Sequence, residues 1–241
     1  MENLIRTSIN PETKSFKNGV AVVYDASLLT EVSPSLFSTE YYGSSINAVK
    51  EGGRSAAWFV NSSAGKAVLR QYRRGGLVAR LIKQKYLWLG ASRTRSFAEF
   101  KVLSKLYKDG VSVPKPIAAM YKRKAVFYSA AIMVQCIENS ITLGAVIKSE
   151  SSPSPDIVNS VADVISSMHN AGVWHADLNV HNILLDETNK AWLIDFDKAR
   201  LCAVTNSQRT QNLDRLQRSI YKVAPSNAGV WAKAIKQEYY S

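Results

Sequence analysis

Alternating apolar and polar positions and short apolar runs predict several β-strands in the first half of the chain. Residues 66–72 alternate with a period of two, which places Val68 and Arg70 on the same face of one strand. The Asn-Ser-Ser-Ala-Gly segment at 61–65 has the composition of a turn before that strand. Further strands are expected at 20–24 and 57–60, and 126–137 is expected to form one or two buried strands.

Helical periodicity predicts the remaining large elements. A helix is expected over 93–107, stopped by Asp109 and Gly110, and the Val-Pro-Lys-Pro segment at 113–116 is expected to be a stiff extended connector. A second helix is expected to run to Asn170 and to be capped by Asp156. Two short strands at 183–185 and 191–194 bracket a turn at 187–189, and helical structure is expected from about residue 207 onwards.

The order of these elements predicts an α+β protein with two lobes. Strands with one helix come first, and mostly helical structure follows. The segment around Met133, Gln135 and Ile137 is expected to cross between the lobes, which divides the chain into residues 1–137 and 138–241. No internal repeat or low-complexity segment interrupts this organisation.

Composition is that of a globular protein and limits the compartment. Of the 241 residues, 46% are hydrophobic and 21% are charged, which is ordinary for a folded domain. Cys136 and Cys202 are too few for a disulfide framework, so a reducing compartment is expected. The first residues have no signal-peptide core, and the longest apolar stretch, at 125–137, is too short to span a bilayer. A cytoplasmic protein without a transmembrane segment is therefore expected.

The net charge of +12 indicates an anionic partner, because Lys and Arg total 31 against 19 Asp and Glu. Basic residues gather between Arg70 and Arg95, interleaved with apolar residues from Leu77 to Leu89 that include Tyr86 and Trp88. This composition suits contact with lipid headgroups at a membrane surface. An amphipathic helix packed on the core, with a charged outer face, explains the same pattern.

The strongest chemical signal is the segment His-Ala-Asp-Leu-Asn-Val-His-Asn at 175–182, followed by a second Asp after an apolar run. Asp177 can orient an attacking hydroxyl and accept its proton. Asn182 and Asp195 can supply oxygen ligands to Mg²⁺. Phosphoryl transfer needs these groups, since its catalysis is mostly positioning and charge neutralisation around metal-bound phosphates. A lone Asp would by default only cap a turn, but the three residues together predict a kinase.

Glu99 lies on the apolar face of the expected helix at 93–107, beside Leu103 and Leu106. A carboxylate in that position needs a cation, and Arg70 on the strand is the candidate. Val68, on the same strand face, is then free to touch a nucleotide base. The alternative is a Glu at the edge of the face that reaches solvent.

These motifs resemble those of the protein-kinase-like superfamily, over roughly residues 49–200. The resemblance is specific at 68–76, 94–100 and 175–182, which are similar to the bacterial 3-deoxy-D-manno-octulosonic acid (Kdo) kinases. It implies a bilobal fold, with an antiparallel N-lobe sheet and one key helix, and a shortened, mostly helical C-lobe. It also implies ATP- and Mg²⁺-dependent phosphorylation of the Kdo 4-hydroxyl on lipid A during lipopolysaccharide core assembly. The site would be the cytoplasmic face of the inner membrane, with the protein bound peripherally.

The same resemblance assigns further residues to the nucleotide and the sugar. Gly52 and Gly53 would cover the phosphates, and Met133 would lie where backbone groups meet adenine. His181, Arg73 and Arg200 are candidate contacts to the sugar acceptor, and His181 could instead face solvent.

Several positions depart from the protein-kinase pattern. Ala176 replaces the Arg that reads a phosphorylated activation loop, so that regulation should be absent. Asn179 replaces a Lys, as in many small-molecule kinases, and Asp197 stands where the metal motif usually has Gly. Arg70 replaces the usual strand Lys; its planar fork can grip phosphate and Glu99 together.

Other functions explain less of the sequence. A zinc site formed by His169, His175 and His181 does not fit common ligand spacings, and His175 is expected to hold the catalytic loop by packing. A catalytically dead, lipid-binding kinase-like module would require loss of a catalytic group. Nucleic-acid binding is motivated by charge alone, and no obligate protein partner is evident. Within the kinases, a heptose or an aminoglycoside-like molecule is the alternative acceptor. The basic stripe on the late helix at 212–219 is either a solvated face or a receiver of an anionic sugar.

Overall fold

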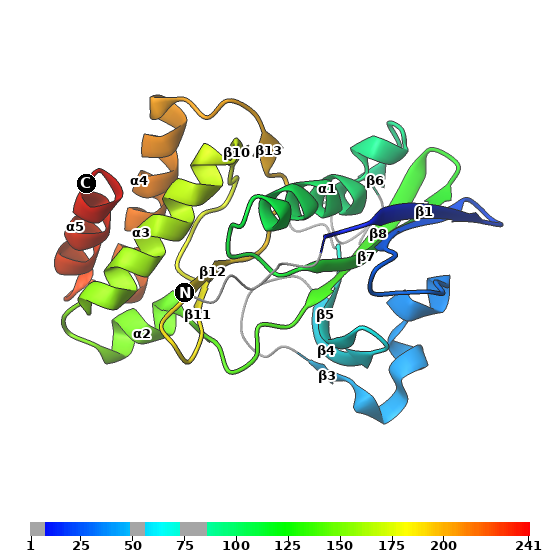
Figure 1. The fold of residues 1–241 in the computed structure, drawn as a ribbon, viewed down its shortest axis with the longest axis horizontal. Coiled ribbons are helices and arrows are strands. Elements are labelled where there is room, and N and C mark those ends of the chain that lie inside the picture. Colours follow the sequence, from blue (N-terminus) through cyan, green and yellow to red (C-terminus); the bar gives the residue numbers. More distant parts are fainter. Residues whose placement is uncertain (1–7, 49–55, 73–85) are drawn as a thin grey trace. The chain divides into compact units, whose positions relative to one another are not determined.

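The chain forms two compact units in a computed structural model that describes residues 8–48, 56–72 and 86–241 (Figure 1). The first unit combines the described residues up to Ser104 with Lys115–Cys136. The second combines Lys105–Pro114 with Ile137–Ser241. Gly52, Gly53 and Arg73, which the sequence assigns to phosphate or sugar binding, lie outside the described residues.

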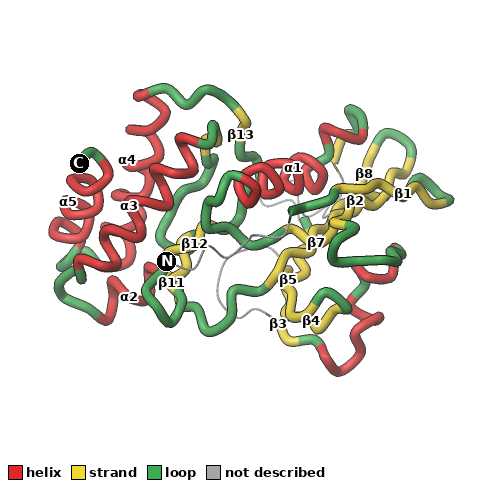
Figure 2. The backbone as a smooth tube through the Cα atoms, viewed as in Figure 1, coloured by secondary structure: helices red, strands yellow, loops and turns green. Residues whose placement is uncertain are grey.

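The first unit is built on an antiparallel sheet with the strand order β1-β2-β7-β8-β5-β4-β3, and β6 pairs with β8 (Figure 2). Its strands are β1 (Pro11–Phe16), β2 (Val20–Asp25), β3 (Asn47–Ala48), β4 (Ala56–Ser62), β5 (Gly65–Gln71), β6 (Tyr86–Leu87), β7 (Pro116–Lys124) and β8 (Phe127–Gln135). Ala67 and Leu69 of β5 are buried, whereas Val68 and Arg70 point to the opposite, partly exposed face. The predicted alternation along this strand is therefore confirmed.

Helix α1 (Arg95–Lys108) packs on this sheet. The Ser96 hydroxyl donates to the Met120 carbonyl at 2.9 Å, and the Phe97 ring lies 5.0 Å from that of Tyr121. These contacts join the first turns of α1 to β7, so the side chain of Glu99 is carried toward the sheet.

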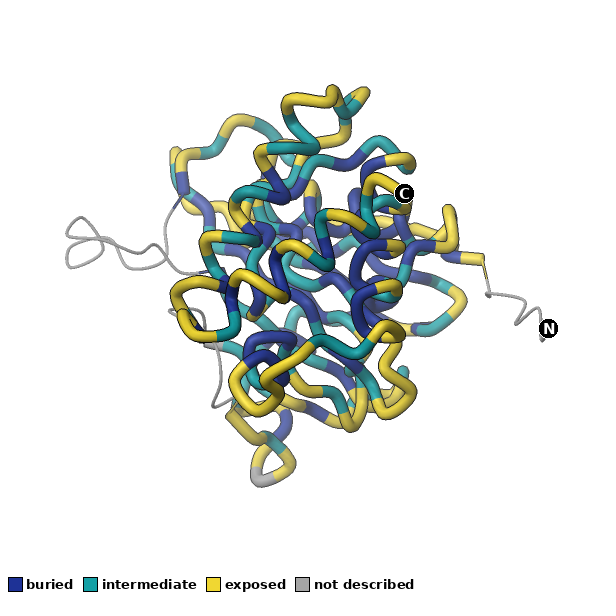
Figure 3. Tube along the Cα trace, turned by 90° about the vertical axis from the view of Figure 1, so that its left-hand side faces the viewer, coloured by how far each residue is buried: buried dark blue, intermediate teal, exposed yellow. Residues whose placement is uncertain are grey.

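The second unit is mainly helical. Its helices are α2 (Leu143–Ser149), α3 (Pro155–Asn170), α4 (Asn206–Val223) and α5 (Ala228–Tyr239). Its short strands are β9 (Ile141–Thr142), β10 (Val173–Trp174), β11 (Ile183–Leu185), β12 (Ala191–Leu193) and β13 (Arg200–Leu201). Buried and exposed positions alternate along the helices (Figure 3), and α3 buries an apolar face that includes Val161 and Ile165. This face forms the core against α5 and β12.

Together the units confirm the predicted α+β class, but several elements differ from expectation. Ser154 is the N-cap of α3, and Asp156 lies in the first turn instead, where its charge still favours the helix dipole. The expected connector at 113–116 ends in the first residue of β7. The expected C-terminal helical region consists of two helices, because α4 ends at Val223 and a short loop leads to the start of α5 at Ala228.

Candidate active site

The predicted catalytic loop runs from His175 to Asn182, between β10 and β11, and its buried residues fix its shape. Leu178 and Val180 are completely buried, which anchors the loop to the core of the second unit. Asp177, between these anchors and the end of β10, keeps 59% of its side chain exposed. A carboxylate that is both exposed and held on an anchored loop is available to a substrate.

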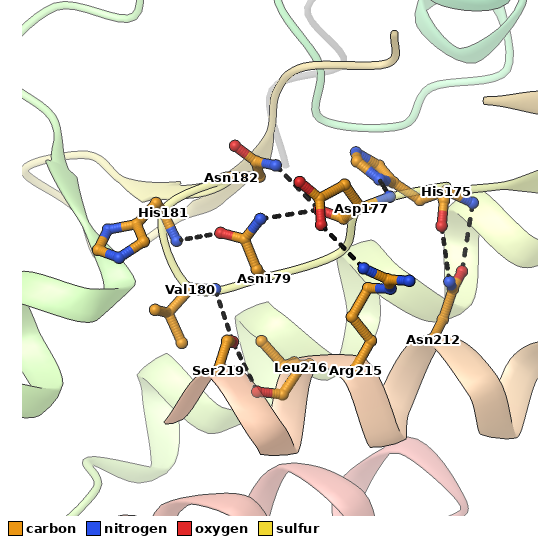
Figure 4. A network of polar contacts seen from close by, with 10 residues as sticks. All are labelled: His175, Asp177, Asn179, Val180, His181, Asn182, Asn212, Arg215, Leu216 and Ser219. Atoms are coloured by element: carbon orange, nitrogen blue, oxygen red, sulfur yellow. Dashed lines mark hydrogen bonds and ion pairs between the residues drawn. The ribbon is translucent and has the colours of Figure 1, made fainter. Parts of the chain in front are cut away.

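Two asparagines brace the backbone at Asp177 (Figure 4). The Asn182 side-chain amide donates to the Asp177 carbonyl at 2.9 Å, and that of Asn179 donates to the same oxygen at 3.0 Å. Because its nitrogen donates to the loop, the other side-chain atom of Asn182, Oδ1, is left in an acceptor role. An amide oxygen in that role suits a hard cation such as Mg²⁺.

His175 joins the catalytic loop to the segment that precedes Asp195. Its Nδ1 accepts from the Asp177 backbone N–H at 3.0 Å, so Nε2 carries the proton and donates to the Ile194 carbonyl at 3.1 Å. Burial lowers the pKa of His175, although the bond to Ile194 and the charges of Asp195 and Asp177 act in the opposite direction. The prediction that His175 holds the loop is confirmed, and it does so as a neutral ring.

Asp195 follows β12 and has a left-handed backbone conformation, with φ of 62°. The Ile194 N–H before it donates to the Asn182 carbonyl at 3.0 Å. The Phe196 ring after it packs 4.9 Å from the His175 ring. Hydrogen bonds through His175 and Asn182 therefore bring the backbone of Asp195 beside the loop that holds Asp177.

The donor atoms at this position fit Mg²⁺. Asn182 and Asp195 offer an amide and a carboxylate oxygen, which are the ligand types that this ion takes from proteins. Among the residues that the structure describes, no group of three or more His, Cys, Asp and Glu side chains gathers as a metal site. Mg²⁺ commonly takes few protein ligands and completes its shell with phosphate oxygens and water, so a small protein donor set is in keeping with it.

Helix α4 supports the loop from below, which the sequence did not predict. The Asn212 amide donates to the His175 carbonyl at 2.7 Å and accepts from the His175 N–H at 3.2 Å. The Ser219 hydroxyl accepts from the Val180 N–H at 3.1 Å and donates to the Leu216 carbonyl at 2.7 Å. Both ends of the loop are thus bonded to one helix (Figure 4).

The carboxylate of Asp177 has a cationic neighbour, Arg215, on helix α4. Nη1 of Arg215 lies 3.2 Å from Oδ1 of Asp177, and 45% of the Arg215 side chain is exposed. Of the residues assigned to the sugar, His181 lies in the pocket beside Asp177. Arg200 does not line that pocket, and its guanidinium stacks 5.5 Å from the ring centre of Trp174.

In the first unit, Glu99 is 3% exposed and forms the predicted ion pair with Arg70. Its second carboxylate oxygen accepts from the Tyr72 hydroxyl, a partner that the sequence did not predict. Val68 lies on the same strand face as Arg70. Met133 pairs with Leu69 and is completely buried in the sheet core, so its side chain is a packing group.

The described end of the basic, aromatic segment is a strand, because Tyr86–Leu87 pairs with β8. Tyr86 is 8% exposed, and its hydroxyl accepts from Arg95 at 2.9 Å, whereas Leu87 and Leu89 are 54% and 62% exposed. Tyr86 is therefore a buried residue that contributes to the packing of the first unit and does not lie on its surface. In the part of the chain that the structure covers, every helix is too short or too polar to cross a bilayer.

Comparison with known proteins places these motifs in a family. The chain is 41% identical over 215 residues to a 3-deoxy-D-manno-octulosonic acid kinase of Xylella fastidiosa (strain 9a5c), covering 89% of this chain and 85% of that protein. It is 43% identical over 205 residues to the protein of the same name in Xanthomonas campestris pv. campestris (strain B100), covering 84% and 81%.

A solved structure described as WaaP in complex with acyl carrier protein has a similar fold, with a TM-score of 0.55 at 18% identity, over 81% of this chain and 77% of that one. This likeness confirms the predicted protein-kinase-like fold. A model of the lipopolysaccharide kinase (Kdo/WaaP) family matches residues 40–239. The chain therefore belongs to the lipopolysaccharide kinase (Kdo/WaaP) family and is a phosphotransferase.

Proposed function

We propose that this protein transfers the γ-phosphate of ATP to the 4-hydroxyl of Kdo on Kdo-lipid A, in the assembly of the lipopolysaccharide inner core. The observation that best supports the proposal is the bridge made by His175, which links the backbone of Asp177 to that of Ile194. Because of this bridge, the candidate base and the candidate metal ligand Asp195 belong to one bonded network. The names of the relatives in Xylella and Xanthomonas support the choice of acceptor.

Each residue of the network has a definite role in this proposal. Asp177 orients the acceptor hydroxyl and takes its proton as the new bond to phosphorus forms. Asn182 and Asp195 hold Mg²⁺, which when bound neutralises charge on the ATP phosphates. His175 holds the backbone at Asp177 next to the backbone before Asp195, since it bonds to the Asp177 N–H and to the Ile194 carbonyl.

The first unit is proposed to bind the nucleotide. Arg70, fixed by Glu99, contacts the phosphates, and Val68 contacts the base. Gly52 and Gly53 are proposed to cover the phosphates. An Arg in this position can serve both partners, because its planar fork presents several N–H donors.

We further propose that the protein acts at the cytoplasmic face of the inner membrane as a peripheral protein. The net charge of +12 suits an anionic glycolipid in an anionic surface. Neither nucleic acid nor an obligate protein partner is required for the reaction.

Mass spectrometry tests the reaction directly. Incubation of Kdo-bearing lipid A precursor with the protein and Mg·ATP is expected to add one phosphate to the Kdo. Asp177→Asn should lower kcat by about a thousandfold, since it removes the proton acceptor while keeping the shape of the side chain. Nucleotide affinity should stay within about twofold of wild type, because Asp177 binds the acceptor and not ATP. Full activity in the Asp177→Asn variant would exclude Asp177 as the base.

The metal role of Asp195 needs a separate measurement. Asp195→Asn preserves the backbone preference but removes the charge, so calorimetry is expected to show weakened binding of Mg·ATP. Unchanged affinity for Mg·ATP would show that Asp195 is no metal ligand.

A further inference from the structure

A pocket of about 430 Å³ opens beside Asp177 on the second unit. Its lining combines the catalytic loop with one face of α4: Asp177, Asn179, His181, Arg215, Arg218, Ser219, Lys222 and Val223. Three of these side chains are cationic, and Asp177 is the one carboxylate among them. Since Arg215 is already paired with Asp177, the pocket has an excess of positive charge.

The three cations lie at helical spacings of three and four residues, so they share one face of α4. Like charges at these spacings oppose helix formation, because the side chains are neighbours. Within the described part of the chain, no carboxylate forms an ion pair with Arg218 or Lys222. The helix thus tolerates a local repulsion that an anionic ligand would relieve.

The position of the pocket restricts which anion it can serve. Ser219, from the same face, bonds to the backbone of Val180, and Arg215 contacts the carboxylate of Asp177. An anion held by this face therefore lies next to the group that orients the acceptor hydroxyl. An anionic group of the acceptor that lies close to its reacting hydroxyl meets this requirement.

We propose that Arg215, Arg218 and Lys222 form the binding site for the carboxylate of the sugar that is phosphorylated. This inference rests on the proposed function, because Kdo is an acid and carries that carboxylate. A heptose has no carboxylate for these residues, and a cationic aminoglycoside would be repelled by them. The pocket thus selects an acidic sugar over both alternative acceptors.

Single charge removals test the site. Arg218→Gln and Lys222→Gln are each expected to raise KM for Kdo-lipid A by about tenfold, since each removes a charge-assisted contact to the carboxylate. The kcat and the KM for ATP should change by less than about threefold, because these residues contact the acceptor alone. Lys233→Gln on α5 removes the same charge from an exposed position outside the pocket and is the matched control. If all three variants show equal kinetics, the inference is wrong.

Modified acceptors identify the source of the anion. Esterification of the Kdo carboxyl should raise KM for the wild type by about as much as the Arg218→Gln and Lys222→Gln double variant does with the native acceptor. The double variant should no longer distinguish ester from acid. Removal of the lipid A phosphates should leave this discrimination intact. If loss of the phosphates, and not the ester, reproduces the effect, the pocket binds lipid A phosphate and the inference is overturned.

Binding without catalysis separates this inference from the proposed function. Free Kdo is titrated into the wild type and the double variant in the absence of ATP, and binding is followed by NMR shifts of the protein. Weaker binding by the double variant supports the pocket even if no phosphate transfer is found. Equal binding by the wild type and the double variant overturns the inference even if the wild type proves to be a Kdo kinase.

Discussion

At the scale of the residue, Glu99 shows how the polar atoms of a buried carboxyl group are paired. It is 3% exposed and has a cation, Arg70, on one oxygen and a hydroxyl, Tyr72, on the other. Burial of a charge is costly unless it is paired and hydrogen-bonded, and here both conditions are met. The ion pair thereby fixes the position of the Arg70 guanidinium, which is proposed to contact the phosphates.

Tyr72→Phe is expected to lower the free energy of unfolding by about 1–2 kcal/mol, because it removes one hydrogen bond to a buried charge. Nucleotide affinity should fall only slightly, since Arg70 keeps its partner. Urea unfolding and nucleotide titration measure the two effects. Tyr121→Phe, which removes the hydroxyl of a half-buried residue whose ring packs on Phe97, should cost less. Equal losses in the two variants would show that the bond to Glu99 contributes nothing specific.

His169 is a second buried polar residue whose partners set its charge. Burial lowers its pKa to about 4, although its hydrogen bond to Asn212 opposes the change. Nε2 lies 3.0 Å from the Asn212 oxygen, and Nδ1 lies 2.8 Å from the Tyr239 hydroxyl. Because the Asn212 amide nitrogen donates to His175, its oxygen accepts, and His169 is protonated on Nε2 alone.

This pKa predicts a loss of stability in acid. In the unfolded chain a His takes up a proton near pH 6.5, whereas the folded protein holds His169 neutral until about pH 4. Stability is therefore complete above pH 6.5 and falls as the pH drops from 6.5 to 4. Between pH 7 and 5 this residue should account for roughly 2 kcal/mol of the loss. Urea unfolding of His169→Gln should show a smaller difference in stability between these two pH values than the wild type shows. A wild-type difference in His169→Gln would contradict the assignment.

At the scale of the element, α2 and α4 hold the catalytic loop from two directions. Helix α4 bonds to the loop through Asn212 and Ser219. Helix α2 contributes Gly144, whose N–H donates to the Val180 carbonyl at 3.1 Å. A Cβ on Gly144 would lie 3.0 Å from a methyl group of Val180 and 3.3 Å from the ring of His181. The glycine therefore permits the close approach of α2 to the loop.

Gly144→Ala is expected to shift the loop by a few tenths of an ångström and to lower kcat/KM for the acceptor several-fold. The KM for ATP should not change, because α2 packs on the loop of the second unit. Gly229→Ala is the matched control: its Cβ would lie 3.7 Å from the Tyr221 hydroxyl, which is an ordinary contact. That variant should keep full activity, because the added methyl group makes only an ordinary contact. Steady-state kinetics of both variants decide the point, and equal activity would refute the role of Gly144.

Local patterns predicted strands that alternate or form a short run of large apolar residues, and missed strands that show neither signal. Strand β5 was predicted because Ala67 and Leu69 alternate with Val68 and Arg70. Strand β1 was missed because nearly all its residues are exposed, so no alternation marks it. Strand β7 was missed because its first residues, Pro116–Ala119, are all buried and begin with a proline that favours a connector.

Candidate groups for chemistry could be predicted because they are close in sequence or of unusual type. Asp177, Asn182 and Asp195 form a spaced motif, and Glu99 is a carboxylate on an apolar face. The supports could not be predicted. Asn212 and Ser219 are ordinary helix residues, and their bonds to the loop depend on the packing of α4. The hydrogen bond from Tyr72 to Glu99 likewise depends on the packing of α1 against the sheet, because the two residues are far apart in the sequence.

At the scale of the whole molecule, the net charge of +12 and two exposed leucines would favour binding of the protein to an anionic lipid surface. Leu87 and Leu89 are 54% and 62% exposed and flank Trp88, whose ring packs 4.8 Å from that of Tyr121. The guanidinium of Arg123 lies 5.1 Å from the same Trp88 ring. Apolar side chains beside cations are the combination that binds lipid headgroups.

Vesicle binding tests this surface. The protein is expected to sediment with vesicles that contain anionic lipid and to be released by salt, because the attraction is electrostatic. Leu87→Ser with Leu89→Ser should reduce sedimentation several-fold, since apolar burial strengthens the contact. Val230→Ser on α5 removes a side chain of similar exposure, 55%, and serves as control. Equal sedimentation of all forms would mean that the leucines do not enter the membrane.

The edge strand β1 protects the large sheet from pairing with other chains. Strand β1 displays Glu12, Lys14 and other polar groups to solvent, and it covers the backbone edge of β2, whose residues are largely buried. A shortened chain trimmed to the residues that match the family would start at Glu40 and lack both strands. It would then bare the edge of β7 and its apolar Ile117 and Ala119, a template onto which other chains can add. Expression of such a shortened form should yield aggregates, so work on this enzyme needs its first two strands intact.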